Sequence, residues 1–311
     1  MHGLNQRVFH TQASNRGMAK RSVLTLVSED ASQDAERGDY DDLATGENND
    51  SEEFDLERKS RRAETVKKDL QMQKTEGGVF SRETLENVAK LGVGGYIDRI
   101  MGPISTGKEA DVFLGELKGK KIAIKIFRLA SASYFRNPTV LQYIIGDERF
   151  KKIKQTPHDL IKSWALKEFR NLKKAEEGHV RVPKPIAIEK NVLVMECIGQ
   201  DKPALQLLKA RVDDYGKVFT DIVSQMARMY QADMVHADLS EYNILMLEEK
   251  PYIIDYAQGV LLSHPKAEEF LERDVRNICT FFRKKGVDCE PDDVLKKVKE
   301  KKVKGRVKRV N

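Results

Sequence analysis

The hydrophobic pattern of this chain changes its period partway along, and no other feature constrains the fold as strongly. In the first half, three short segments alternate apolar and polar side chains, as strands do: 96–104, 111–117 and 121–127. Short polar connections separate these segments, which predicts an antiparallel meander. In the second half, Val218 and Ile222 begin a stripe of apolar residues at helical spacing. The pattern therefore predicts an α+β fold, with a sheet-rich half followed by a mainly helical half.

Capping signals place the helices of the first half. Ser81 predicts the start of one helix, which should end at the glycines of 92–95, and a charged helix near 62–75 comes before it. A capping hydroxyl, a first-turn proline and a reciprocal carboxylate at 156–159 start a further helix, which should end at Gly178.

Two hairpins and a closing helix complete the expected elements. The segments 185–189 and 191–197 should pair and bring the antiparallel sheet of the first half to five strands. In the second half, 243–246 and 252–254 should form a shorter hairpin, and 265–285 should form a helix that closes the domain.

Length and charge distribution set the expected domain boundaries. A chain of 311 residues with 40% apolar residues can bury the core of a bilobal enzyme. We predict a disordered acidic arm over 1–60, a first lobe over 61–198, a second lobe over 199–290 and a basic tail over 291–311. The first lobe should carry a flexible insertion near 128–155.

The sequence favours a cytoplasmic protein without a membrane segment. No apolar run approaches the ~20 residues of a membrane span, and the N-terminus lacks the apolar stretch of a secretory signal. Either Met1 or Met18 can be the start. An odd number of cysteines without metal-ligand spacing, Cys197, Cys279 and Cys289, predicts free thiols in a reducing compartment.

The most informative segment is His-Ala-Asp-Leu-Ser-Glu-Tyr-Asn at 236–243, in a loop after a helix. Asp238 and Asn243 have the spacing of the protein-kinase catalytic loop. In such a loop the carboxylate accepts or orients the proton of an incoming hydroxyl, and the amide oxygen binds the magnesium that neutralises the phosphates. A capped polar turn would explain the octapeptide alone, but the next motif argues against that alternative. We expect His236 to position the loop backbone.

Asp255 follows the apolar strand residues Ile253 and Ile254, where kinases place the Asp that binds Mg²⁺. A single Asp at the end of a strand is usually a turn former. Its position after Asn243 favours a metal ligand instead. We therefore predict Asn243 and Asp255 as metal ligands and Asp238 as the base or orienting carboxylate.

Lys125 lies in an apolar strand, and a buried ammonium needs an anionic partner. The phosphates of ATP would serve, with Glu168 of the following helix holding the lysine. Glu168 shares a helix face with Trp164 and Leu172, which predicts that it points inward. A surface position for Glu168 is one alternative; another is that Glu176 or Glu177, in the last turn of the helix, is the partner of Lys125.

The loop Ser-Thr-Gly-Lys-Glu-Ala at 105–110 lies between the first two strands, where backbone N–H groups can contact phosphates. Ser105, Gly107 and Lys108 are the candidates, although one glycine is a weak signal by itself. The segment 195–198 ends the fifth strand, where a connection between lobes exposes backbone groups to an adenine edge; its side chains could equally be core.

Three motifs together, at 105–110, 236–243 and 253–255, closely resemble the RIO family of atypical protein kinases, and within it the Rio-one branch. The similarity covers residues 65–290. The Rio-two branch differs in both longer motifs and carries a winged helix that we do not discern in this sequence.

The resemblance implies a trimmed bilobal kinase fold without the activation loop and the peptide-binding helices. It implies ATP with Mg²⁺ or Mn²⁺ as cofactors, serine autophosphorylation, and adenine contacts by the backbone of Glu196 and Ile198. It also implies a role in late maturation of the small ribosomal subunit, with precursor rRNA and ribosomal proteins as partners. In this family the residue that matches Asp255 accepts phosphate itself, so ATP hydrolysis is an alternative working cycle.

Two other functions remain open from the sequence. A small-molecule kinase of the aminoglycoside or choline type shares the fold and the Asp–Asn spacing, but the 105–110 loop argues against it. A ribosome-binding assembly factor that uses nucleotide as a switch would dock on RNA through the basic segment Lys296 to Arg309. That segment lacks interleaved aromatic residues, and a solvated helix end explains it equally well.

Overall fold

The computed structural model describes residues 48–73, 80–129, 137–150 and 156–300. Its helices are α1 (Asn48–Met72), α2 (Arg82–Val93), α4 (Pro138–Ile145), the 3-10 helix η2 (Glu148–Phe150), α5 (Pro157–Glu177), α6 (Tyr215–Gln231), α7 (Ala267–Arg283) and α8 (Pro291–Lys299). Its strands are β1 (Arg99–Thr106), β2 (Ala110–Leu117), β3 (Lys120–Phe127), β4 (Pro185–Glu189), β5 (Val192–Glu196), β6 (Leu205–Gln206), β7 (Met234–Val235), β8 (Ile244–Leu247), β9 (Lys250–Ile253) and β10 (Val260–Leu261).

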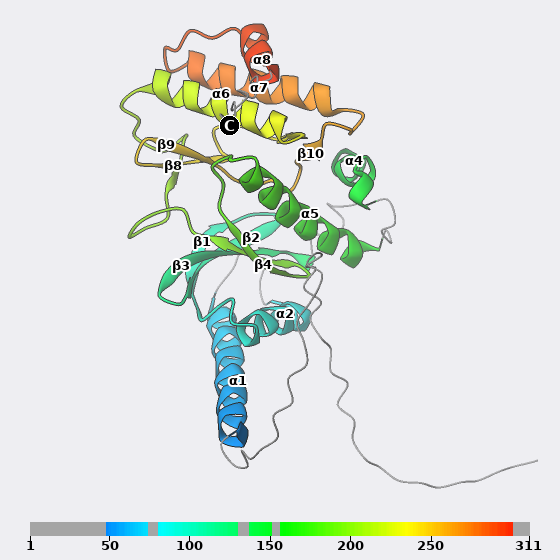
Figure 1. Cartoon of the computed structure of the whole chain (residues 1–311), viewed down its shortest axis with the longest axis vertical. Coiled ribbons are helices and arrows are strands. Elements are labelled where there is room, and N and C mark those ends of the chain that lie inside the picture. Colours follow the sequence, from blue (N-terminus) through cyan, green and yellow to red (C-terminus); the bar gives the residue numbers. More distant parts are fainter. Residues whose placement is uncertain (1–47, 74–79, 130–136, 151–155, 301–311) are drawn as a thin grey trace, which may run out of the picture. The chain divides into compact units, whose positions relative to one another are not determined.

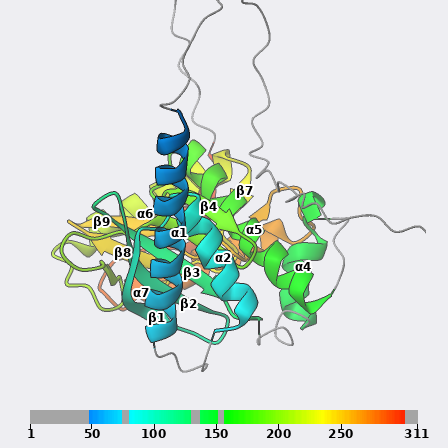
Figure 2. The ribbon, with the colours of Figure 1, turned by 90° about the horizontal axis from the view of Figure 1, so that it is seen from below.

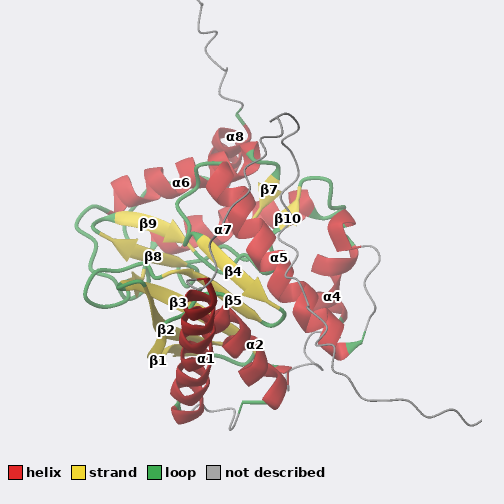
Figure 3. Cartoon of the chain, turned by 60° about the horizontal axis from the view of Figure 1, so that its bottom comes forward, coloured by secondary structure: helices red, strands yellow, loops and turns green. Residues whose placement is uncertain are grey.

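The first lobe is built on a five-stranded sheet in the order β1-β2-β3-β5-β4, with every neighbouring pair antiparallel. The predicted meander and hairpin are therefore confirmed. α1 and α2 cover one face of the sheet and α5 the other (Figures 1 and 3). Because both faces are covered, β3 is apolar and buried over most of its length, and the cleft described below opens at the α5 side.

α5 begins and ends where its capping residues predict. The hydroxyl of Thr156 accepts a hydrogen bond from the backbone N–H of Asp159 at 3.2 Å, and Gly178 follows the last turn. Trp164, Glu168 and Leu172 are all buried. The inward orientation expected for Glu168 follows from this helix phase.

The second lobe is mainly helical, as predicted. α6, α7 and α8 pack together at one end of it, and small sheets with the strand orders β6-β8-β9 and β10-β7 lie nearer the first lobe (Figure 1). The turn from β7 and the end of β9 bring the two acidic motifs to the same side. No helix in the described part of the chain is long and apolar enough to cross a bilayer.

The expected N-terminal arm is shorter than 1–60, because residues 48–60 belong to α1. This helix crosses the outer face of the sheet and is anchored by the buried side chains of Val66 and Leu70 (Figure 2). Glu, Leu, Arg and Lys, which are good helix formers, occur at 52–59 and favour the extension of the helix toward the N-terminus. The remainder of the expected arm lies outside the described residues.

The insertion near 128–155 is not irregular throughout. Asn137 caps α4, whose apolar residues Val140 and Tyr143 enter the main core together with Phe150 of η2. A short apolar helix can bury its side chains between α5 and α7, and this burial overrides the turn signals around it. The segments 130–136 and 151–155 lie outside the described residues.

The expected basic tail begins as part of the second lobe. α8 occupies 291–299, and its Val294 and Val298 are buried against α6 and α7. Helical spacing of these two valines buries one face, while the lysines occupy the other. Residues 301–311, with the remainder of the basic segment, lie outside the described residues.

Candidate functional site

A cleft of about 520 Å³ lies between the sheet, α5 and the loops of the second lobe. Every site residue predicted from the sequence lines this cleft. These residues are Ser105, Gly107, Lys108, Lys125, Glu168, Glu196, Ile198, Asp238, Asn243 and Asp255. The volume falls within the range of ordinary small-ligand sites.

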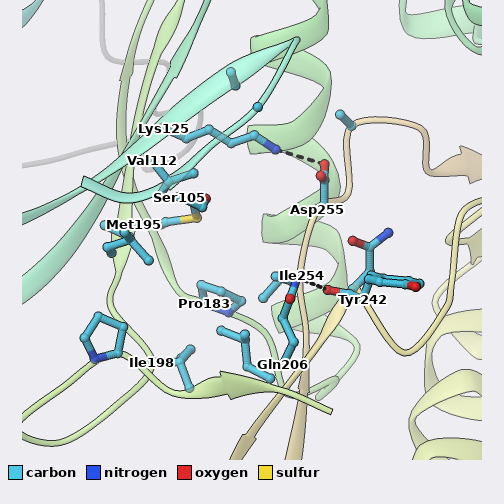
Figure 4. A pocket seen from close by; sticks show the side chains of 18 of the residues that line it. Ser105, Val112, Lys125, Pro183, Met195, Ile198, Gln206, Tyr242, Ile254 and Asp255 are labelled. Carbon is cyan, nitrogen blue, oxygen red and sulfur yellow. Dashed lines mark hydrogen bonds and ion pairs between the residues drawn. The ribbon is translucent and has the colours of Figure 1, made fainter. Parts of the chain in front are cut away.

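Lys125 joins the two sides of the cleft. Its Nζ lies 2.8 Å from Oε2 of Glu168 on α5 and 2.9 Å from Oδ1 of Asp255 in the second lobe. Figure 4 shows the Lys125 and Asp255 side chains pointing toward one another from opposite walls. Lys125 and Glu168 are buried, whereas 47% of the Asp255 side chain is exposed to the cleft. Asp255 is therefore the member of this triad that a ligand can reach.

Lys125 and Asp255 hold each other ionised, whereas burial raises the pKa of Glu168 to about 7. Burial disfavours the Lys125 ammonium, but the carboxylates of Asp255 and Glu168 outweigh burial and raise the pKa of Lys125 above its usual range. Burial also raises the pKa of Asp255, yet the adjacent Lys125 reverses this and leaves that pKa below its usual range. The site thus keeps a cation and an anion side by side, as a site for a metal-bound polyphosphate requires.

Asp238 faces the same cleft with amide partners. Nδ2 of Asn243 donates to the Asp238 backbone oxygen at 2.8 Å and to its Oδ2 at 3.3 Å, and Nε2 of Gln258 donates to Oδ2 at 3.2 Å. Burial, followed by repulsion from Asp255, raises the pKa of Asp238 to about 6. A carboxylate with this pKa can accept a proton near neutral pH. Because the Asn243 amide nitrogen faces Asp238, its oxygen remains for a cation.

The two acidic motifs bend through unusual backbone conformations. Ala237 has φ +63° and Asp255 has φ +64°, in the left-handed region that residues with a Cβ adopt rarely. Such conformations persist only where surrounding contacts fix them. Both positions flank or carry a predicted catalytic carboxylate, so the residues that fix them are part of the site.

Asp274 on α7 is one such residue, and the sequence analysis missed it. Its carboxylate accepts hydrogen bonds from the backbone N–H groups of Ala237 at 2.8 Å and Leu239 at 2.9 Å, on either side of Asp238. Asp274 is buried, and burial raises its pKa to about 7. A signal was present: Asp274 lies one turn after Phe270 and one turn before Ile278, on the apolar face of an amphipathic helix.

His236 has the positioning contact expected of it. Its Nε2 lies 2.9 Å from the backbone oxygen of Ile254, so it links the catalytic loop to the strand before Asp255. His236 is fully buried, and burial lowers its pKa to about 4. The imidazole is therefore neutral at pH 7, and Nε2 donates the hydrogen.

The first lobe supplies the remaining walls of the cleft. Between β1 and β2, the backbone N–H of Gly107 donates to the oxygen of Ala110 at 3.0 Å and closes a tight turn over the Lys125 side. Glu196 is the last residue of β5, and Ile198 follows where the chain passes to the second lobe. Met195 of β5 points into the cleft with Val112 (Figure 4). These positions place backbone groups at the apolar end of the cleft and charged groups at the other.

The donor set fits a hard cation shared with phosphate. Among the residues that the structure describes, no three His, Cys, Asp or Glu side chains cluster as a metal site. Asn243 and Asp255 offer two oxygen ligands, and Mg²⁺ characteristically takes one or two protein oxygens together with phosphate and water. This fold and this cleft define the class: a phosphotransferase with the protein-kinase architecture.

The comparisons with known proteins narrow the class. A family model described as "RIO domain" matches residues 111–294. The RIO-type serine/threonine-protein kinase Rio1 of Haloferax volcanii is 42% identical over 231 residues, covering 73% of this chain and 78% of that protein. Its namesake in Methanocaldococcus jannaschii is 38% identical over 257 residues, covering 81% and 87%.

Solved structures agree on the fold. The Rio2 kinase–ADP/Mg²⁺–phosphoaspartate complex from Chaetomium thermophilum matches with a TM-score of 0.53 at 23% identity, over 73% of this chain and 70% of that chain. The chain belongs to the RIO family of serine/threonine protein kinases, in the branch of its Rio1-named relatives. The resemblance drawn from its motifs is confirmed, and the chain is a protein kinase.

Proposed function

We propose that the chain binds ATP with Mg²⁺ in the cleft and transfers the γ-phosphoryl group to serine or threonine, including serines of its own chain. The observation that carries this proposal is the bridging position of Lys125, bonded to both Glu168 and Asp255 at the charged end of the cleft. In kinases this lysine holds the α- and β-phosphates, and the carboxylate beside it holds the metal.

Each wall has its own task in this proposal. Asn243 and Asp255 hold Mg²⁺, which neutralises charge on the phosphates when it is bound. Asp238 orients the incoming hydroxyl and accepts its proton, which its pKa of about 6 allows. Ser105, Lys108 and the N–H groups of the Gly107 turn contact phosphate oxygens.

The opposite end of the cleft binds the adenine base of ATP in this proposal. The backbone of Glu196 and Ile198 binds the adenine edge, between the apolar side chains of Val112 and Met195. Mn²⁺ would occupy the same two oxygen ligands. Positioning and charge neutralisation then supply most of the rate enhancement.

We propose an aspartyl-phosphate cycle as a second activity of the same site. An Oδ of Asp255 attacks the γ-phosphorus, and the bond to the β–γ bridging oxygen breaks as ADP leaves. Water then hydrolyses the acyl phosphate, releasing inorganic phosphate and restoring the carboxylate. The exposed Asp255 side chain supports this step, as does the phosphoaspartate of the solved Rio2 complex from Chaetomium thermophilum.

The substrate class is proposed from kinship with Rio1. We propose that the kinase acts in the cytoplasm on precursors of the small ribosomal subunit, and that the basic segment Lys296 to Arg309 contacts rRNA. The lysines at the end of α8 provide a fixed beginning for that segment.

Turnover assays on two single variants test the chemistry. Asp238→Ala and Asp255→Ala should both lose ATP turnover, and Asp238→Ala should keep ATP binding. Asp213→Ala, at a highly exposed position, is the matched control and should keep turnover.

The aspartyl-phosphate cycle has its own test. Hydroxylamine-sensitive phosphate should form in the wild type and disappear with Asp255→Ala. Normal turnover in both variants would refute the assigned roles, and the absence of such phosphate from the wild type would refute the aspartyl-phosphate cycle.

Salt titration tests the RNA contact. Deleting 301–311 leaves α8 and its buried valines intact, so the lobe should keep its fold. Each phosphate contact contributes to the slope of log affinity against log salt, and the deletion should make that slope shallower. An unchanged slope would contradict docking through the segment.

A further inference from the structure

The insertion formed by α4 and η2, residues 138–150, is wedged between helices of both lobes. The ring of Tyr143 lies 6.3 Å from that of Trp164 on α5 and 5.0 Å from that of Phe270 on α7, measured between ring centroids. From this position two polar connections run from the insertion to the backbone beside Asp238 and beyond Asp255.

The first connection passes through α7. Nη2 of Arg273 donates to the Tyr143 hydroxyl at 3.2 Å and also donates to the backbone oxygen of Ala237. Ala237 is the residue before Asp238 and has positive φ. The hydroxyl of Tyr143 therefore helps to hold the guanidinium that fixes the strained peptide of the catalytic loop.

The second connection passes through α5. The guanidinium of Arg149 donates to Oδ2 of Asp147 at 2.6 Å and to Oδ1 of Asn171 at 2.7 Å. Nδ2 of Asn171 then donates to the backbone oxygens of Tyr256 at 2.9 Å and Gly259 at 2.8 Å. These two carbonyls bound the turn that follows Asp255.

A buried lysine reinforces the second connection. Lys167, one helical turn before Asn171, also donates to the oxygen of Gly259, and its Nζ lies 3.9 Å from Oδ2 of Asp147. Asp147, Lys167 and Asn171 are 2%, 0% and 0% exposed. Buried polar groups in such a network cannot replace a lost partner with water. The loss of one group therefore leaves its neighbour without a hydrogen bond and weakens the position of that neighbour.

We propose that the insertion is a positioning element for phosphoryl transfer: Tyr143 and Arg273 set the catalytic loop at Asp238, and Arg149, Asn171 and Lys167 set the turn after Asp255. The proposal rests on the roles proposed above for Asp238 and Asp255. Apolar packing alone would hold the insertion in the core. In addition, one polar connection ends on the backbone beside Asp238, and the other ends on the backbone of the turn after Asp255.

Tyr143→Phe tests the first connection with the loss of one oxygen. The ring packing stays, so folding should be preserved, while kcat should fall about three- to tenfold as one hydrogen bond to the guanidinium is lost. The dissociation constant for ADP with Mg²⁺ should stay at the wild-type value. An unchanged kcat would overturn this half of the proposal.

Asn171→Leu tests the second connection through nucleotide binding and amide hydrogen exchange. The dissociation constant for ADP should rise about tenfold in the presence of Mg²⁺, a typical loss for a residue that supports a metal ligand. Binding measured in EDTA should stay unchanged. Backbone amides of 256–259 should exchange hydrogen faster than in the wild type. Arg149→Gln, at a less buried position, should act in the same direction and serves if Asn171→Leu does not fold.

Asn87→Leu is the matched control. Asn87 is also a buried helix asparagine, on α2, and donates to Oδ1 of Asn191 at 2.8 Å on the other face of the sheet. It should lower stability without changing the Mg²⁺ dependence. If Asn171→Leu and Arg149→Gln behave like this control, the positioning role is overturned. If the wild type itself binds ADP no better with Mg²⁺ than in EDTA, the proposed function fails instead.

Discussion

The two walls of the cleft are built in different ways. On the first wall, Lys125 and Glu168 project from the interior of a strand and a helix, whose own backbone hydrogen bonds fix their positions. On the second wall, Asp238 and Asp255 lie in loops, with positive φ at Asp255 and at the residue before Asp238. Side chains from two helices hold these loops, chiefly Asp274 of α7 and Asn171 of α5. The first wall should therefore depend on its own charges, and the second on residues that never touch the substrate.

On the first wall, the largest effect is expected from Lys125→Met. Removing the ammonium takes away the group that faces the phosphates, and kcat/KM should fall at least about 10²-fold. The free energy of unfolding should also fall, because the buried Glu168 carboxylate loses its cation. Steady-state turnover and circular dichroism melting measure the two. Lys120→Met, at an exposed position at the start of β3, should behave as the wild type; equal losses in both variants would contradict the assignment.

The next effect is expected on the second wall, from Asp274→Ala. Two buried backbone N–H groups lose their acceptor, which should cost about 2 kcal/mol of unfolding free energy and lower kcat about tenfold or more. Asp274→Asn keeps one acceptor oxygen and should lie between. Urea unfolding and turnover provide the measurements. Glu272→Ala, on the solvent side of α7, should change neither quantity; a loss of stability without a loss of kcat would mean that other contacts hold the catalytic geometry of the loop.

A pH effect sharpens the contrast between the walls. Asp238 has a pKa raised to about 6 from 3.8, so the folded state binds its proton more tightly than the unfolded state. Its contribution to stability is therefore favourable at low pH and is lost as pH rises through about 6. Asp238→Asn should be more stable than the wild type at pH 8, by about 1 kcal/mol, and this gain should vanish near pH 4. Thermal melts at both values decide this, and a gain independent of pH would contradict it.

The smallest effect is expected in the loop at 105–110, from Gly107→Ala. An added Cβ would lie 3.2 Å from the backbone oxygen of Ala110, a tight contact that the exposed turn can relieve. The KM for ATP should rise about twofold, with little change in stability. Gly119→Ala is the opposite control, since φ is +74° there and no atom is within contact distance. Gly119→Ala should lower the melting temperature and leave the KM for ATP unchanged. If Gly119→Ala changed the KM for ATP more than Gly107→Ala does, the assignment of the 105–110 loop to the ATP site would be wrong.

The same contrast explains what the sequence could predict. Strand alternation and capping residues are local signals, so the five-stranded sheet, α5 and the facing of Glu168 follow from them. The two acidic motifs carry a fixed spacing, which was enough to place Asp238 and Asp255 in one cleft. What supports those loops is tertiary. Asp274 and Asn171 lie on helices whose patterns look amphipathic and ordinary, and only a polar residue on the buried face marks them.

The errors at the domain boundaries have a related cause. α4 and α8 are short helices beside turn residues or lysine runs, and composition over such windows indicates irregular structure. A few buried residues, such as Tyr143 of α4 and Val298 of α8, decide their state through contacts with distant helices. Composition reports an average, whereas burial of two or three side chains is enough to order a turn of chain.

At Ala237 and Asp255 the left-handed backbone makes it possible to separate the conformation that folding requires from the side chain that catalysis requires. In a library of substitutions sorted first for folding and then for phosphoryl transfer, glycine should be enriched in the first sort at both positions, because it adopts this conformation without a steric cost. The second sort should retain glycine at 237 and discard it at 255. Two residues with nearly the same positive φ would thus show, in one experiment, where only the backbone conformation is required and where the side chain itself is required.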